Sequence, residues 1–262
     1  MSHNDEYTDA MLDAMDLIWG EGFMAPGGED HVDNMVVGLD LEGRRVLDIG
    51  CGQGRPACIV ADKYGAEVTG TDLEAHLIER ASRRAAAAGL ASRTQFLVVE
   101  PGPLLFEDNH FDAILISGAL TQVEDKLAMY CECLRVLKPG GTLSCYDWMK
   151  PPGPFSAEML YWFELEGLTY AMRTPEEHLA LMAQAGFVDA CCDDRSDWYC
   201  ARAREEHAAM AGPLRADLVG LLGEDTADHF IEDWRALTVV CDKGDLLTVY
   251  TRASKPIKRE EV

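Results

Sequence analysis

The sequence is poor in basic residues, with 23 Lys and Arg against 46 Asp and Glu, and its formal net charge is -23. An acidic chain is repelled by nucleic acid and by anionic membranes. We therefore expect neither as a partner, and we expect a cationic or neutral small molecule as substrate. The alternative explanation is a solvated acidic surface that keeps the protein soluble.

Long apolar runs and metal-ligand spacings are also missing. No run approaches the roughly 18 apolar residues of a membrane-spanning helix. The opening residues MSHNDEYTDA are acidic, unlike a secretory signal. The nine cysteines are odd in number and scattered, and they form no Cys/His quartet. We therefore expect a cytoplasmic protein with reduced thiols and no metal.

Short apolar runs rich in Val, Ile and Leu alternate with helical patterns in the first 150 residues. This alternation predicts an α/β fold, a parallel sheet wound on both faces. The predicted strands are 45–50, 67–72, 94–100, 111–117 and 141–147, and the predicted helices are 8–19, 74–89 and 124–137.

The pattern changes after Trp148. Helices are expected at 156–172, at 175–185 and through most of 200–239, with strands at 187–192 and 245–254. Segments 150–172 and 200–239 are therefore candidates for a helical cap over the carboxyl edge of the sheet, where doubly wound folds bind their ligands.

The stretch RVLDIGCGQGRP reads as a strand, a glycine turn and the start of a helix. The dinucleotide motif G-x-G-x-x-G would need glycine at position 55, where Arg55 stands, and no Gly-Lys-Ser/Thr follows for a P-loop. Asp48 precedes the turn. An acid there is unfavourable for phosphate and suits a ligand that carries an ammonium group.

Two further acids, Asp72 and Glu100, end the next two predicted strands. Asp72 lies where a ribose-binding acid belongs in such folds. Each acid alone is a weak signal, because strand ends often carry a solvated Asp. Three acids on successive strands beside a glycine turn indicate a ligand site.

These residues resemble class I S-adenosylmethionine-dependent methyltransferases. The segments VLDIGCGQG, FDAILISGAL and LRVLKPGGTL carry the resemblance, together with Asp72 and Glu100. It covers about residues 40–150. It implies a Rossmann-like, doubly wound, seven-stranded, mostly parallel sheet whose last strand is antiparallel. It also implies S-adenosyl-L-methionine as cofactor and S-adenosyl-L-homocysteine as product.

The resemblance also implies roles for individual residues. Gly50 and Gly52 would let the backbone approach the methionine portion near Asp48, Asp72 would bind the ribose hydroxyls, and Glu100 would lie near the adenine amino group. The full cofactor-binding set implied is Asp48, Gly50, Gly52, Gln53, Asp72, Leu73, Glu100, Pro101, Ser117 and Met24.

The flanking segments are similar to a narrower group, the phosphoethanolamine N-methyltransferases. The stretches EYTD, WGEGFMAPGG and RTPEEHLALMAQAGF and the pair Asp233-Trp234 match this group in order. The similarity implies that residues 1–30 form a lid segment, 31–150 the cofactor-binding core, and 151–262 the cap insertions and last two strands. Tyr7 would be the active-site tyrosine.

The sequence departs from that group at its substrate site. Gln122 stands where the group has a catalytic histidine, and a glutamine side chain cannot act as a base. Trp148, Glu164, Leu168 and Leu237 stand at phosphate-binding places, where only Tyr170 is kept. We therefore expect a small acceptor without phosphate, most simply an amine. Tyr7 and Gln122 would orient it, and the substrate-binding residues would be Trp148, Glu164 and Tyr170.

Two other functions stay open at this point. The protein could consume S-adenosylmethionine without a second substrate, as an intramolecular cyclase that releases methylthioadenosine. It could also bind the cofactor without catalysis. The sequence shows no heptad seam, and we expect a monomer or a homodimer.

Overall fold

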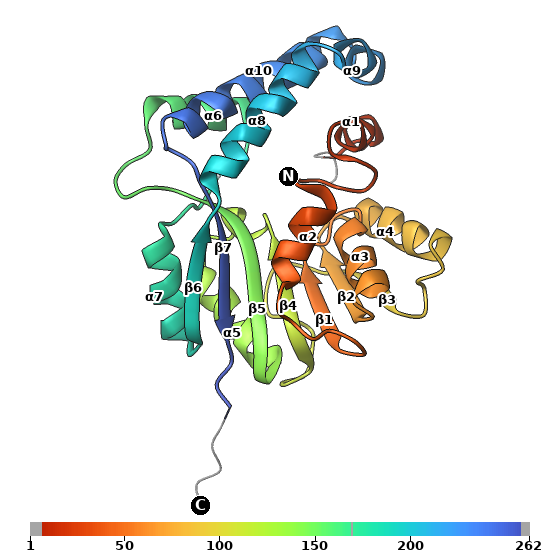
Figure 1. The fold of residues 1–262 in the computed structure, drawn as a ribbon, viewed down its shortest axis with the longest axis vertical. Coiled ribbons are helices and arrows are strands. Elements are labelled where there is room, and N and C mark those ends of the chain that lie inside the picture. The colour runs from red at the N-terminus through yellow and green to blue at the C-terminus, as the bar shows by residue number, and fades with distance from the viewer. Residues whose placement is uncertain (1–6, 169, 258–262) are drawn as a thin grey trace, which may run out of the picture.

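A seven-stranded sheet in the order β3-β2-β1-β4-β5-β7-β6 forms the centre of the molecule (Figure 1). The computed structural model describes residues 7–168 and 170–257. Strand β7 is antiparallel to β5 and β6, and the other pairs are parallel. The predicted Rossmann-like fold is thus confirmed. The strands are β1 (Arg45–Ile49), β2 (Glu67–Asp72), β3 (Thr94–Val98), β4 (Phe111–Ser117), β5 (Leu137–Met149), β6 (Val188–Asp194) and β7 (Leu247–Ser254).

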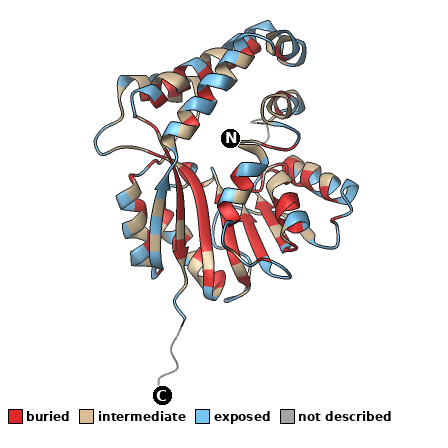
Figure 2. Cartoon of the chain, in the orientation of Figure 1, coloured by how far each residue is buried: buried red, intermediate tan, exposed pale blue. Residues whose placement is uncertain are grey.

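Helices cover both faces of the sheet. One face carries α2 (Gly28–Val36), α3 (Arg55–Lys63) and α4 (Ala75–Ala87), and the other carries α5 (Lys126–Val136) and α7 (Pro175–Ala185). Successive side chains of a strand point to opposite faces. The central strands must therefore be apolar at nearly every position, and Figure 2 shows them buried along most of their length.

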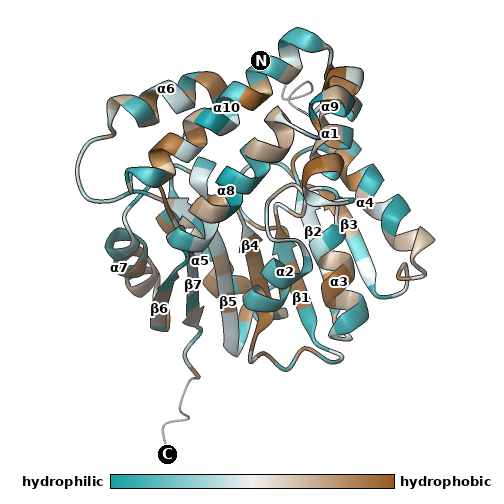
Figure 3. Ribbon diagram, turned by 45° about the horizontal axis from the view of Figure 1, so that its top comes forward, coloured by the Kyte–Doolittle hydropathy of each residue, from teal (hydrophilic) through white to brown (hydrophobic). Residues whose placement is uncertain are grey.

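The remaining helices form a cap above the carboxyl ends of the parallel strands (Figure 1). They are α6 (Ala157–Glu166), α8 (Ser196–Ala211), α9 (Arg215–Leu222) and α10 (Glu224–Asp242). Helix α1 (Asp9–Trp19), from the opposite end of the chain, packs into the same apolar cluster through Ala14 and its neighbours. Hydrophilic and hydrophobic residues alternate along these helices (Figure 3), as expected for elements with one solvated side.

The structure corrects two sequence predictions. Helix α2 was not expected, although Glu29 and Asp30 in its first turn are typical of a helix start. The helix predicted over 156–172 ends at Glu166, because Gly167 adopts a left-handed φ of 66° and caps it. Tyr170 therefore lies beyond α6. Among the described residues, no helix is both long and apolar enough to cross a membrane.

Candidate functional site

The glycine turn between β1 and α3 leaves no room for side chains. Gly50 and Gly52 have φ values of +74° and +52°, in the left-handed region that glycine adopts without strain. A Cβ on Gly50 would come within 2.7 Å of the Ala119 Cβ, and one on Gly52 within 2.7 Å of the Met24 sulfur. The backbone N–H of Gly52 donates to Asp72 Oδ2 at 2.9 Å. The turn, the end of β2 and Met24 therefore meet at one place.

Asp48 is a buried acid beneath this turn. Its side chain is 4% exposed, and its Oδ2 has no hydrogen-bond partner among the described residues. Burial, and secondly the charge of Asp72, raises the pKa of Asp48 to about 7. An unpartnered buried carboxylate oxygen is costly, and a ligand that donates hydrogen bonds would remove this cost.

Asp72 ties two loops together and keeps capacity for a ligand. Its two oxygens accept from the backbone N–H groups of Gly52, at 2.9 Å, and Glu74, at 3.1 Å. A carboxylate offers about four lone-pair positions, so two more donors can bind. Leu73, Glu100 and Pro101 are exposed at the same edge, where the Val99 N–H donates to the Asp72 carbonyl at 2.9 Å.

Ser117 ends β4 on the other side of the turn and contacts a histidine that the sequence analysis missed. The Nε2 of His31 lies 2.9 Å from Ser117 Oγ, and its Nδ1 lies 2.6 Å from the Tyr250 hydroxyl. His31 is 3% exposed, and burial lowers its pKa to about 4. Glu29 and Asp30 could have indicated the start of α2. This helix places His31 on the face that it buries against the sheet.

Gln53 connects the turn to α1 and α4. Its Nε2 donates to Asp16 Oδ1 at 3.2 Å, and its Oε1 accepts from Arg80 at 3.1 Å. Arg80 also pairs with Asp9 and Asp13 of α1, at 2.9 and 3.1 Å. Helix α1 is thereby held against both the turn and α4.

An aromatic cluster, Trp148, Trp162, Tyr170 and Tyr199, lies between β5 and the cap. The Trp148 ring centroid is 5.1 Å from Trp162, 6.0 Å from Tyr170 and 6.1 Å from Tyr199. Trp162 and Tyr170 stack at 5.5 Å with an interplanar angle of 10°. Trp162 and Tyr199 are buried, whereas Trp148 and Tyr170 are half-buried. The latter two rings are the accessible members of the cluster.

The carboxyl groups beside this cluster belong to Glu166 and Asp233. Burial, and then the charge of Glu166, raises the pKa of Asp233 to about 9. Burial raises the pKa of Glu166, against hydrogen bonding from Asp233 and Tyr170. Glu164, two residues earlier on α6, is exposed. Glu166 follows the buried Trp162 by four residues and so shares its face.

Tyr7 and Gln122 are the two residues that the sequence predicts to orient an acceptor. Tyr7 is half-buried and lies close enough to Tyr170 to raise its pKa, after the larger effects of burial and of the two carboxyl groups. Gln122 is exposed in the 3-10 turn η1 (Leu120–Gln122). The neighbouring Thr121 carbonyl accepts from the Ala171 N–H at 2.8 Å, which holds the Tyr170 segment beside this turn.

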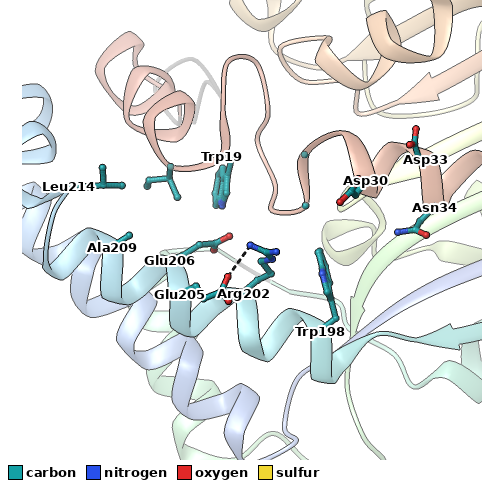
Figure 4. A pocket seen from close by; sticks show the side chains of 13 residues that line it. Trp19, Asp30, Asp33, Asn34, Trp198, Arg202, Glu205, Glu206, Ala209 and Leu214 are labelled. Atoms are coloured by element: carbon teal, nitrogen blue, oxygen red, sulfur yellow. Dashed lines mark hydrogen bonds and ion pairs between the residues drawn. The ribbon is translucent and has the colours of Figure 1, made fainter. Parts of the chain in front are cut away.

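A separate cavity of about 630 Å³ lies between the N-terminal segment and α8 (Figure 4). The indole rings of Trp19 and Trp198 line it. It is acidic, because Asp30, Asp33, Glu205 and Glu206 outnumber Arg202, which pairs with Glu205 at 2.9 Å. Gly27 forms part of its wall, and a Cβ there would come within 2.9 Å of the Trp198 ring.

The cysteines give no sign of metal binding. All nine are free thiols, and burial raises the pKa of five of them near the core, Cys51, Cys58, Cys133, Cys145 and Cys241. Across the described part of the chain, His, Cys, Asp and Glu form no group of three that could hold a metal ion.

Residues 47–145 match a family model described as a methyltransferase domain. The matched span runs from β1 to β5 and contains the glycine turn, Asp72, Glu100 and Ser117. This match confirms the predicted resemblance.

The full chain is similar to larger proteins. It is 27% identical over 234 residues to a phosphoethanolamine N-methyltransferase of Triticum aestivum, which covers 89% of this chain and 45% of that protein. The chain thus spans about half the length of such curated relatives. A phosphoethanolamine N-methyltransferase 2 of Haemonchus contortus, solved with S-adenosylhomocysteine, has the same fold, with a TM-score of 0.88 and 22% identity. The match covers 96% of this chain and 58% of that one. The structure of the [4+2]-cyclase SpnF is also similar, with a TM-score of 0.68 and 26% identity. The match covers 98% of this chain and 86% of that one.

Proposed function

We propose, because the chain contains a methyltransferase domain, that it transfers a methyl group from S-adenosylmethionine to a small acceptor without phosphate, an amine nitrogen. The observation that carries the cofactor assignment is the edge of the sheet. There, Asp48 Oδ2 lacks a partner among the described residues, Asp72 has lone pairs to spare, and two left-handed glycines keep side chains out of the turn.

The residues present fit this cofactor. Asp48 would accept from the ammonium group of the methionine portion, and Asp72 from the ribose hydroxyls. The exposed apolar side chain of Leu73 and the carboxylate of Glu100 lie where the adenine would bind. The cofactor supplies an activated methyl group on a sulfonium sulfur.

The acceptor assignment rests on the aromatic cluster and on Glu166. The carboxyl groups of Glu166 and Asp233 both act on Tyr170. A phosphate would be repelled there, whereas an ammonium would gain about 0.5–2 kcal/mol for each good contact with an aromatic face. Trp148 and Tyr170 offer such faces. This cluster would hold an acceptor amine, or a cationic group elsewhere on the acceptor.

Tyr7 and Gln122 would orient the acceptor. Neither residue is a strong base at neutral pH, so the amine must arrive neutral, with its lone pair in line with the methyl group. The chain's contribution is then positioning and exclusion of water. Helix α1 and the cap would provide this exclusion, with residues 1–30, of which 1–6 lie outside the described residues, acting as a lid over residues 31–150.

The product nucleoside tests the proposal. Purified protein would be incubated with S-adenosylmethionine and a panel of small amines, with oxygen, sulfur and carbon acceptors in parallel. We expect S-adenosylhomocysteine only with amines. Methylthioadenosine formed without an acceptor would instead show self-cleavage of the cofactor, and turnover with another acceptor class alone would overturn the nitrogen assignment.

A further inference from the structure

A line of three hydrogen-bonded side chains leads from β7 through α2 to the end of β4, and Tyr250 and His31 are buried while Ser117 is half-buried. Tyr250 contacts His31 Nδ1 at 2.6 Å, and His31 Nε2 contacts Ser117 Oγ at 2.9 Å. Both imidazole nitrogens are therefore engaged. The ring is 3% exposed, and burial keeps it neutral by lowering its pKa to about 4. A neutral imidazole has one donor and one acceptor, so the line must have a direction.

The two distances favour one direction. Hydrogen bonds from O–H donors cluster near 2.7–2.8 Å and those from N–H donors near 2.9–3.0 Å. The 2.6 Å contact fits the Tyr250 hydroxyl donating to Nδ1, and the 2.9 Å contact fits Nε2–H donating to Ser117 Oγ. Burial raises the pKa of Tyr250, and a hydrogen bond with the Asn34 side chain at the outer end of the line opposes this rise.

Ser117 is the inner end of this line. Its oxygen accepts from His31, which is its hydrogen-bond partner among the described residues, so its own hydrogen is left to point into the site. Ser117 lies two residues beyond Leu115, the β4 residue that aligns with Asp48 of β1. Two residues along a strand put the two side chains on the same face, about 7 Å apart along it.

The site thus presents a donor and an acceptor on the same face of two neighbouring strands. Asp48 Oδ2 lacks a donor, and the Ser117 hydroxyl lacks an acceptor. An α-amino acid group carries an ammonium and a carboxylate about 3 Å apart, and a hydrogen bond of about 2.8 Å at each end would let it bridge the two side chains. We propose that His31 and Tyr250 are positioning residues that hold the Ser117 hydroxyl as a donor to the carboxylate of the cofactor's methionine portion. This inference rests on the proposed function.

A double-mutant cycle on the affinity for S-adenosylhomocysteine, measured by calorimetry, tests it. Ser117→Ala should weaken binding about tenfold, as expected for loss of a hydrogen bond to a charged group. Tyr250→Phe frees the imidazole to take its other tautomer, so that Ser117 donates to His31 instead, and should weaken binding about threefold to tenfold. The double variant should bind no more weakly than Ser117→Ala.

Two controls separate this role from a structural one. Tyr146→Phe changes a neighbouring ring that packs edge-on against His31, at 4.5 Å, through a hydroxyl without a partner among the described residues, and it should leave affinity unchanged. Methylthioadenosine lacks the amino acid group, and its affinity should be the same in Tyr250→Phe and wild type. Imidazole ¹⁵N spectra should show the proton of His31 moving from Nε2 in wild type to Nδ1 in Tyr250→Phe.

The outcomes are distinct. If the losses from Ser117→Ala and Tyr250→Phe add fully, or if methylthioadenosine is affected equally, His31 and Tyr250 only support the fold and the inference fails. An unchanged affinity in Tyr250→Phe would also reject it. If wild-type protein binds neither S-adenosylmethionine nor S-adenosylhomocysteine, it is the proposed function that fails.

Discussion

Gln53, in the glycine turn, donates a hydrogen bond from Nε2 to Asp16 Oδ1 in α1, at 3.2 Å. The same oxygen accepts from the Gly22 N–H at 2.8 Å. One carboxylate therefore fixes the end of α1 and the segment that leads to Met24, which lies against Gly52. The position of α1 and the conformation of the turn are coupled through this contact.

Replacing Asp16 should loosen α1 without unfolding the core. Asp16→Ala removes two hydrogen bonds, each worth about 0.5–1.5 kcal/mol net. Amide hydrogen exchange within residues 9–24 should accelerate about tenfold, while exchange in the central strands stays the same. Asp40→Ala, at an exposed loop aspartate, is the control. Unchanged exchange in α1 would show that Asp16 does not hold it.

Gly52 and Gly89 form a matched pair for testing the glycine turn. Both have left-handed φ values, +52° and +74°, but a Cβ on Gly52 meets Met24, whereas one on Gly89 meets nothing within 4 Å. Gly52→Ala and Gly89→Ala should each cost about 1–2 kcal/mol of stability through backbone strain. Only Gly52→Ala should abolish cofactor binding in calorimetry. Normal binding by this variant would remove the turn from the site.

Asp48 should make stability depend on pH. Its pKa is raised to about 7, so between about pH 4 and pH 7 the folded protein holds a proton that the unfolded chain has lost. Stability therefore falls as the pH rises through this window, by at most about 4 kcal/mol. Asp147, whose pKa burial also raises to about 7, contributes a similar slope. The melting temperature of Asp48→Asn, measured relative to that of wild type, should therefore increase as the pH is raised from 5 to 8.

The same acid should release its proton when the cofactor binds. An ammonium group beside Asp48 favours the carboxylate and so lowers its pKa. At pH 6, calorimetric titration with S-adenosylhomocysteine in buffers of different ionisation enthalpy should show a net release of protons in wild type. Asp48→Asn should show less release. Equal release in both proteins would place the titrating group elsewhere.

Glu166 and Glu164 lie on the same helix, so that a comparison of their variants tests which of the two carboxylates binds the acceptor. Glu166→Gln removes the charge beside Tyr170 and should raise the KM for a cationic or amine acceptor about tenfold, as expected for loss of a hydrogen bond to a charged group. The exposed Glu164 should tolerate Gln with no change in KM. The reverse result would return the role to Glu164, which the sequence predicted.

The sequence predicted the parts of the fold that depend on local pattern. Strands 67–72 and 111–117 and helix 175–185 were placed at their observed bounds, because apolar runs and the Thr174 capping box mark them. The glycine turn and the acids at the strand ends were also found, since parallel strands bring their carboxyl ends to one edge.

Residues that act through long-range packing were not found. His31 is brought to Ser117 and Tyr250 from positions 86 and 219 residues away in the chain. The sequence predicted Glu164 for the substrate site. The proposal that Glu166 takes this place depends on its contacts with Tyr170, beyond the end of α6, and with Asp233, in the distant helix α10. Asp16 and Arg80 became recognisable only once α1 and α4 were seen side by side.

Helix α1 has its apolar partners at the far end of the chain, in α6, α8, α9 and α10. During synthesis from the N-terminus, the domain matched by residues 47–145 can collapse early, but α1 must wait with its apolar side uncovered until the last helices emerge. Nascent chains arrested before residue 242 should therefore bind chaperones more strongly than the complete chain. They should also be cleaved faster by proteases near the N-terminus.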